Sequence, residues 1–197
     1  MHCELIDYMG NDVRVANAAR VSFNKETDWQ IGYDHGVDYH GVYEVERKDL
    51  HERDIKLLNY LAKNNHWTPF SHVMITMRET VPIFVARQRF KHMVGFTYNE
   101  VSRRYVDDAP EFFVPDVWRK AAENKKQGSS DEEITWISNE EWEGNIKEDY
   151  ARVIDDLSCI YRCMIDSGVA PEQARMVLPQ SMYTEYYVTG SLVAFAR

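Results

Sequence analysis

The chain has 197 residues and carries 23 Lys and Arg against 32 Asp and Glu, which gives a formal net charge of −9 at pH 7. Its length and its hydrophobic content of 44% predict one domain, over residues 1–197, with a core of its own. The acidic charge argues against nucleic-acid binding. The sequence has no 18-residue apolar run, no secretory leader and only three cysteines, so we expect a cytoplasmic protein without membrane spans or disulfides.

The predicted elements begin with a helix over residues 12–23, where apolar residues recur at helical spacing. Residues 24–45 are rich in Gly, Asp, Tyr and His without a sustained period, and we expect a loop. A second helix is predicted over residues 46–65. Residues 72–78 alternate as a strand does, and a proline suited to the first helical turn predicts a helix over residues 82–93.

The second half of the chain is dominated by a long predicted helix. Residues 124–133 have the composition of a solvated loop, and residues 140–167 follow as the long helix, ended by Gly168. Cys159 and Cys163 lie four residues apart on this helix, and we expect both thiols to be buried.

The last predicted elements alternate between helix and strand. Residues 171–178 predict a helix, and residues 181–189, rich in Tyr and Val, predict a strand. Ser191 then caps an apolar helix, of which the sequence contains about two turns.

The most informative stretch lies within residues 87–104, where five cations gather around one carboxylate, Glu100. Clustered cations on an acidic protein indicate a local anion site rather than a general basic surface. Polar side chains that can orient an anion lie between the cations. The cations are Arg87, Arg89, Lys91, Arg103 and Arg104, and the polar residues are Gln88, His92, Thr97, Asn99 and Ser102.

Two groups within this stretch predict binding chemistry. Gln88, Lys91 and His92 stand at i, i+3 and i+4 of the predicted helix and share a face, which suits a uracil ring or a flavin phosphate but also an ordinary solvated surface. Residues 100–104 supply the backbone N–H groups, hydroxyl and arginines that a phosphate requires. Ser102 has no general base beside it in the sequence, so we interpret it as a binding residue rather than a nucleophile.

Four parts of the chain, in the same order, resemble the flavin-dependent thymidylate synthase family. Asn99–Tyr105 is close to the family's Asn-Glu-x-Ser-x-Arg-Tyr, and Lys91-His92-Met93 stands where the family has Arg-His-Arg. His66–His72 is similar to its His-x-Thr-Pro-Phe-x-His turn, and Glu172–Pro179 contains its Ala-Arg-x-x-Leu-Pro. Residues 9–23 look like its N-terminal segment.

The resemblance implies two sets of site residues, and we expect no metal because the chain has no convincing ligand set with the right spacing. The nucleotide dUMP would be bound by Gln88, Lys91, Glu100, Val101, Ser102, Arg103, Arg104 and Arg175. FAD would be bound by Ser22, His66, Thr68, Lys91, His92, Met93, Glu100, Ser191 and Arg197. Because Met93 removes a cation that the family has, the flavin diphosphate needs another partner, and Arg87, Arg89 and Arg103 stay open as alternatives.

The resemblance also implies the reaction. The family methylates dUMP to dTMP with a one-carbon unit from 5,10-methylenetetrahydrofolate, FAD as cofactor and NADPH as reductant, and it uses no protein nucleophile on the pyrimidine. The protein would supply binding and electrostatics. The implied fold is a mixed α/β (α+β) fold, with a twisted, mainly antiparallel sheet flanked by helices, assembled as a homotetramer with active sites between subunits.

The family continues with a further helix past the point that corresponds to Arg197, and that helix carries an arginine thought to polarise the uracil. We therefore assign no catalytic residue within residues 1–197 and expect a truncated chain, one part of a split protein or a degenerate paralogue. The alternative function is a catalytically impaired homologue that binds nucleotide or flavin. An RNA-binding module is a weaker alternative that rests on the basic cluster and the aromatic residues alone.

Overall fold

The structure, a computed structural model, describes residues 1–105, 108–123 and 128–196. The predicted flavin residue Arg197 and residues 124–127 of the predicted loop therefore lie outside the described part. The chain forms two compact units. Unit 1 comprises residues 1–2, 80–91 and 100–186, and unit 2 comprises residues 3–79, 92–99 and 187–197.

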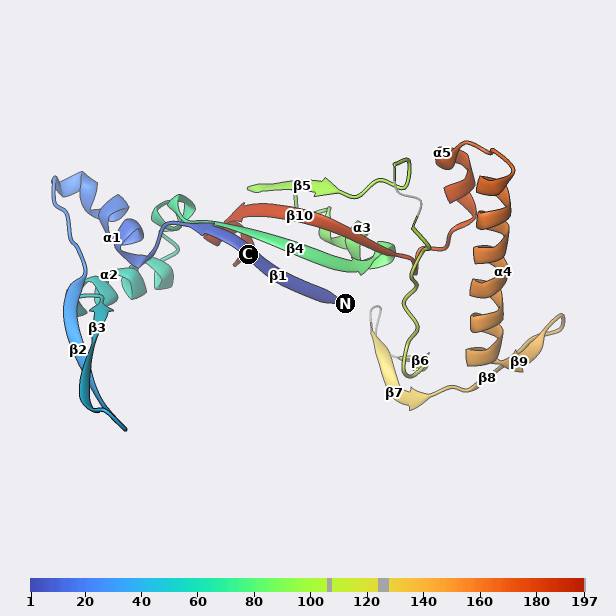
Figure 1. Cartoon of the computed structure of the whole chain (residues 1–197), viewed down its shortest axis with the longest axis horizontal. Coiled ribbons are helices and arrows are strands. Elements are labelled where there is room, and N and C mark those ends of the chain that lie inside the picture. Colours follow the sequence, from blue (N-terminus) through green and yellow to red (C-terminus); the bar gives the residue numbers. More distant parts are fainter. Residues whose placement is uncertain (106–107, 124–127, 197) are drawn as a thin grey trace. The chain divides into compact units, whose positions relative to one another are not determined.

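A four-stranded sheet has the strand order β1–β4–β10–β5 (Figure 1). Its strands are β1 (His2–Met9), β4 (Met74–Pro82), β10 (Tyr183–Ser191) and β5 (Phe96–Glu100). Every second residue of β10 is buried, from Thr184 to Gly190, because successive side chains of a strand point to opposite faces. The strands predicted over residues 72–78 and 181–189 are confirmed in β4 and β10, whereas β1 and β5 were not predicted.

Unit 2 contains the helices α1 (Asp12–Arg20), α2 (Glu52–Lys63) and α6 (Leu192–Phe195), with 3₁₀ turns η1 (Val21–Phe23) and η2 (Thr68–His72). The helix predicted over residues 12–23 is confirmed in α1 and η1. Asn11 begins α1 by accepting the Arg14 N–H at 3.0 Å, and Ser191 begins α6 in the same way, as predicted, through the Ala194 N–H at 3.3 Å.

The loop predicted over residues 24–45 is wrong in its second half, which forms an antiparallel hairpin. Strands β2 (Gln30–Asp38) and β3 (Gly41–Asp49) pair from Gln30 with Asp49 to Asp38 with Gly41. The turn between them is closed by the Asp38 carboxylate, which accepts the His40 N–H at 2.8 Å, and by Gly41 at φ 119°. Because residues 41–49 are a strand, the predicted helix 46–65 begins only at Glu52.

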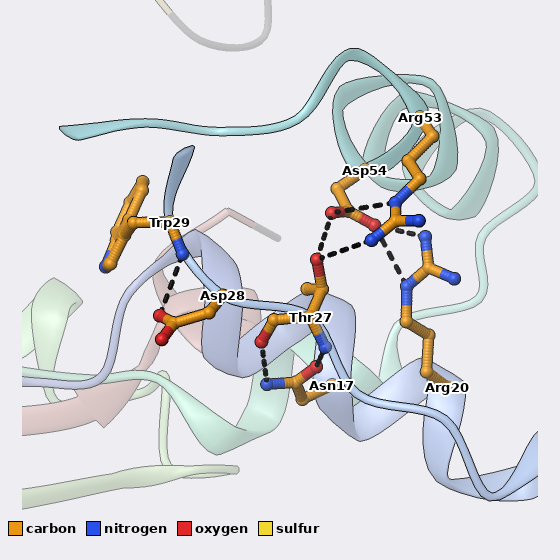
Figure 2. Close-up of polar contacts among 7 residues, drawn as sticks. All are labelled: Asn17, Arg20, Thr27, Asp28, Trp29, Arg53 and Asp54. Carbon is orange, nitrogen blue, oxygen red and sulfur yellow. Dashed lines mark hydrogen bonds and ion pairs between the residues drawn. The ribbon is translucent and has the colours of Figure 1, made fainter. Parts of the chain in front are cut away.

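A polar cluster anchors the chain that enters this hairpin (Figure 2). The Asn17 side chain accepts the Thr27 N–H at 2.7 Å and donates to the Thr27 carbonyl at 2.9 Å. The Thr27 hydroxyl donates to Asp54 of α2 at 2.7 Å, and Arg20 of α1 forms an ion pair with the same buried carboxylate. Burial raises the pKa of Asp54, but the Thr27 hydroxyl and the Arg20 guanidinium together hold this pKa below its ordinary value.

Unit 1 contains α3 (Ile83–Arg89), α4 (Ile146–Asp166), α5 (Pro171–Ala174) and the 3₁₀ turn η3 (Arg175–Val177). Its short strands pair as β6 (Arg119–Ala121) with β7 (Ser129–Glu133) and as β8 (Trp136–Ser138) with β9 (Glu143–Asn145). The loop prediction is therefore wrong over residues 129–133, and the long helix starts at Ile146, not at residue 140, because β9 occupies the preceding residues. Gly168, at φ 80°, follows the end of α4 as predicted.

Two further expectations about unit 1 are wrong. Cys159 and Cys163 are exposed, because the buried side of α4 includes Tyr161 and a residue two positions away points to about the opposite side of a helix. The helix predicted to reach residue 93 ends at Arg89, since the Lys91 N–H bonds to the Gln88 carbonyl at 3.2 Å in a tighter turn. Within residues 1–105, 108–123 and 128–196, no helix is long and apolar enough to cross a membrane.

Candidate functional site

Unit 1 contains a pocket of about 510 Å³, a volume typical of small-molecule sites. It is formed by α3, the chain that follows β5, η3 and the start of β10. Its charged and polar lining consists of Arg87, Glu100, Ser102, Arg103, Arg104, Arg175, Tyr183 and Thr184. Its apolar lining consists of Ile83, Ala86, Phe90, Val101, Leu178 and Met182.

Backbone hydrogen bonds fix the walls of this pocket. At the start of α3, the Ile83 N–H donates to the Met182 carbonyl at 2.9 Å and the Phe84 N–H donates to the Gln180 carbonyl at 3.0 Å. On the other side, the Val101 N–H donates to the Glu185 carbonyl at 2.9 Å. The helix that carries Arg87 and the segment that carries the other cations are thus both held to the region around the start of β10.

The arginines of the pocket have no carboxylate partner within the described residues. Arg104 donates from Nε to the Ser102 hydroxyl at 3.3 Å, and its guanidinium lies 5.2 Å from the centre of the Tyr105 ring. Arg103 donates to the Asp108 carbonyl, and Arg175 donates to the Glu172 carbonyl at 3.4 Å. Guanidinium groups without a counter-ion around a cavity make a site for a phosphate or another polyvalent anion.

Among the described residues, Glu100 is the one carboxylate in the lining of this pocket. It ends β5, and its Oε1 accepts a hydrogen bond from the buried Thr184 hydroxyl at 2.7 Å. A carboxylate among four arginines cannot lie against a phosphate without repulsion, so it suits the part of a ligand that offers hydrogen-bond donors.

Most of the residues predicted to bind the nucleotide meet at this pocket. Glu100, Val101, Ser102, Arg103, Arg104 and Arg175 line it, whereas Gln88 and Lys91 are exposed and lie outside its lining. The predicted face of Gln88, Lys91 and His92 does not persist, because α3 ends at Arg89.

Sequence reasoning did not place Arg87, Phe90 or Thr184 in the nucleotide site. The first two had a detectable signal, since Ile83, Arg87 and Phe90 stand at i, i+4 and i+7 and share a helix face. Thr184 had none, because nothing local distinguishes it from other polar residues of a strand.

The predicted flavin residues are distributed over both units. In unit 2, Ser22, Thr68, His92 and Met93 are exposed, and the His66 ring stacks on Tyr60 with 6.0 Å between ring centres. Ser191 is buried and its oxygen is engaged in capping α6. Lys91 and Glu100 belong to unit 1.

Unit 2 has a mainly apolar pocket of about 420 Å³ of its own. Three predicted flavin residues, His66, Thr68 and Ser191, are sequence neighbours of its lining. An apolar cleft with a half-exposed tryptophan suits a flat aromatic ring. The lining is Leu61, Ala62, Asn65, Trp67, Phe70, Leu192, Val193 and Ala196.

Comparison with known proteins identifies the family. The family model Thy1, thymidylate synthase complementing protein, matches residues 4–197. The chain belongs to the flavin-dependent thymidylate synthase family. The resemblance drawn from the sequence motifs is therefore confirmed.

Matches to several curated relatives extend over almost the whole chain. The flavin-dependent thymidylate synthase of Thermosipho africanus is 35% identical over 188 residues, which are 94% of this chain and 69% of that protein. The corresponding protein of Thermotoga neapolitana is 34% identical over 94% of this chain and 68% of its own length. For the Thermus thermophilus protein, at 34% identity, the chain spans 57% of the relative's length.

A solved structure is also similar to this chain. PolB from Streptomyces cacaoi, a UMP/dUMP methylase bound with 5-Br dUMP, matches with a TM-score of 0.69 and 27% identity. The match covers 98% of this chain and 74% of that chain. The mixed α+β fold with antiparallel pairs and helices is thus shared with a protein whose structure is bound with 5-Br dUMP.

Proposed function

We propose that the pocket of unit 1 binds a uridine 5′-monophosphate, dUMP in the first place, and that the protein methylates it to dTMP. The observation that carries this proposal is the group of four arginines without carboxylate partners around a cavity of about 510 Å³, within the described residues. PolB, 27% identical to this chain, is bound with 5-Br dUMP and supports the choice of ligand.

The residues of the pocket have separable roles in this proposal. Arg103, Arg104 and Arg175, with the Ser102 hydroxyl, hold the phosphate, because guanidinium forks and a hydroxyl match its oxygens. Arg87 adds a further positive charge from α3. Glu100 accepts a hydrogen bond from the nucleoside. The apolar residues of the lining exclude water from the ring, which strengthens the polar contacts around it.

The donor set that the family resemblance assigns to FAD fits that cofactor chemically. Lys91 offers a positive charge and His92 offers an N–H donor for a diphosphate, Thr68 offers a hydroxyl, and the exposed Met93 thioether can pack against a ring. When bound, FAD would supply the hydride, with NADPH as its reductant and 5,10-methylenetetrahydrofolate as the one-carbon donor. The protein's own contribution is to bind, to orient and to stabilise charge on the uracil. We also propose a homotetramer.

The proposal is tested by titrating the purified chain with dUMP and with UMP in a calorimeter, with CMP as the control nucleotide. We expect dUMP to bind and CMP to bind much more weakly. Flavin uptake is followed by visible absorbance, and dTMP formation is followed by chromatography with all co-substrates present. A well-folded protein that binds neither uridine nucleotide would refute the assignment of the pocket.

The same measurements separate the alternative function. A catalytically impaired homologue would bind the nucleotide or the flavin and form no dTMP. An active enzyme would bind both and form dTMP only when FAD, NADPH and the folate are supplied.

A further inference from the structure

Thr184 is a polar residue at a position that faces the core. Its neighbours two residues before and after it, Met182 and Tyr186, are 6% and 1% exposed, and Thr184 itself is 5% exposed. A buried hydroxyl is costly unless it makes a hydrogen bond. The partner of this hydroxyl is the Glu100 carboxylate, at 2.7 Å.

The hydrogen bond from Thr184 holds the side chain of a residue whose main chain is already held. The Val101 N–H, one residue after Glu100, donates to the Glu185 carbonyl, one residue after Thr184. Glu100 is therefore held beside β10 through its main chain and through Oε1. Its second oxygen, Oε2, has no hydrogen-bond partner within the described residues, and the side chain lines the arginine pocket.

We propose that Thr184 is a positioning residue that orients the Glu100 carboxylate so that Oε2 accepts a hydrogen bond from the 3′-hydroxyl of the nucleotide sugar. The inference rests on the proposed function, since it takes a uridine monophosphate as the ligand of this pocket. The phosphate is drawn to the arginines, which leaves the sugar hydroxyl as a donor for the carboxylate. A carboxylate that is already oriented loses less rotamer freedom when the ligand binds.

The same unit contains a matched control. The Thr80 hydroxyl donates to the Glu185 carboxylate at 3.2 Å, also from a strand residue to a glutamate. Neither Thr80 nor Glu185 belongs to the lining of the pocket. Removal of this second hydroxyl reproduces the structural cost of a lost Thr–Glu hydrogen bond without touching the nucleotide.

The test measures dUMP affinity by calorimetry in the unsubstituted chain and in Thr184→Val, Thr184→Ser and Thr80→Val. Valine keeps the shape of threonine without the hydroxyl, whereas serine keeps the hydroxyl. We expect Thr184→Val to weaken dUMP binding about five- to tenfold, and we expect Thr184→Ser and Thr80→Val to bind as the unsubstituted chain does. Thermal unfolding of each variant establishes that it is folded.

Two further arms show whether Thr184 acts through Glu100 and on the sugar. Glu100→Gln combined with Thr184→Val should lose little more affinity than Glu100→Gln alone, because the two residues act as one unit. The 2′,3′-dideoxy analogue of dUMP lacks the 3′-hydroxyl that would donate to Glu100. It should therefore bind equally to the unsubstituted chain and to Thr184→Val.

Each opposite result overturns the inference. Equal dUMP affinity in Thr184→Val, an equally weak Thr184→Ser, or a full additional loss in the double variant would exclude a positioning role. A loss of affinity for the dideoxy analogue in Thr184→Val would exclude the sugar hydroxyl. If the unsubstituted chain binds no uridine monophosphate, the proposed function fails as well, and that outcome is distinct from the others.

Discussion

Arg104 is the residue at which the nucleotide proposal is most directly tested. Its guanidinium contacts the Ser102 hydroxyl and the Tyr105 ring and has no carboxylate partner within the described residues. Removal of one charged contact to a phosphate costs about 1.5–3 kcal/mol. Arg104→Ala should therefore weaken dUMP binding about tenfold or more, measured by calorimetry, with flavin content unchanged.

Arg162→Ala provides the control for this substitution. Arg162 is an exposed arginine of α4 in the same unit, it donates to the Ser158 carbonyl at 3.4 Å, and it lies outside the pocket lining. We expect this variant to bind dUMP as the unsubstituted chain does. Unchanged dUMP affinity in Arg104→Ala would remove Arg104 from the site.

Among individual site residues, those that the sequence could reveal lie next to one another along the chain. Glu100 to Arg104 form one continuous motif, and they line one pocket. Thr184 is 84 residues away from Glu100 and reaches it only through strand pairing, so no local pattern marks it. Tertiary structure alone brings such a residue to the site.

One buried carboxylate, that of Asp54, anchors the segment that enters the β2–β3 hairpin. Asp54 accepts the Thr27 hydroxyl and pairs with Arg20, and its pKa is lowered relative to its ordinary value because these partners outweigh burial (Figure 2). A carboxylate whose pKa is lower in the folded state stabilises the fold above its unfolded pKa, and that contribution is lost as the pH falls through the folded pKa.

We therefore expect Asp54→Asn to lower the free energy of unfolding by about 3 kcal/mol at pH 7, because Arg20 loses its partner in a buried place. The difference between the two proteins should shrink below about pH 4, where the Asp54 contribution of the unsubstituted chain is lost. Urea unfolding at pH 7 and at a series of lower pH values measures both effects.

Asp34→Asn is the matched control for this carboxylate. Asp34 pairs with Arg47 at 2.7 Å, but both side chains are more than half exposed. Exposed ion pairs contribute about 0–1 kcal/mol, so this variant should unfold almost as the unsubstituted chain does. Equal stability of Asp54→Asn and Asp34→Asn at pH 7 would show that the buried cluster does not anchor the hairpin entry.

Two helix-end signals were predictable because they are local. The cap at Ser191 and the glycine at 168 each act within one turn, and both occur where the sequence predicts them. The hairpin was missed because Gly32, Gly36 and the aspartates interrupt the alternation of its Tyr and Val residues. Its stability comes from pairing between the two strands, which the preference of each residue by itself does not reveal.

For the whole molecule, the expectation of one domain over residues 1–197 stays a prediction and has a direct test. A single domain of this kind should unfold in one cooperative transition, with the same urea midpoint by tryptophan fluorescence and by circular dichroism. The five tryptophans include residues of both units, so fluorescence reports on each. Two separate midpoints would show that the units unfold independently.

The proposed homotetramer makes a prediction about the mass in solution and its response to salt. Large apolar side chains are strongly exposed in the single chain, among them Phe23, Val37, Val42 and Met176 at 76%, 80%, 74% and 76%. Apolar surface of this kind favours association, and its burial is not screened by salt, unlike pairing between exposed charges. We therefore expect light scattering to give about four times the chain mass of 23.2 kDa, and the same mass when NaCl is raised to about 1 M. A mass that falls toward one chain in high salt would indicate association through charges, and a monomer at low salt would refute the tetramer.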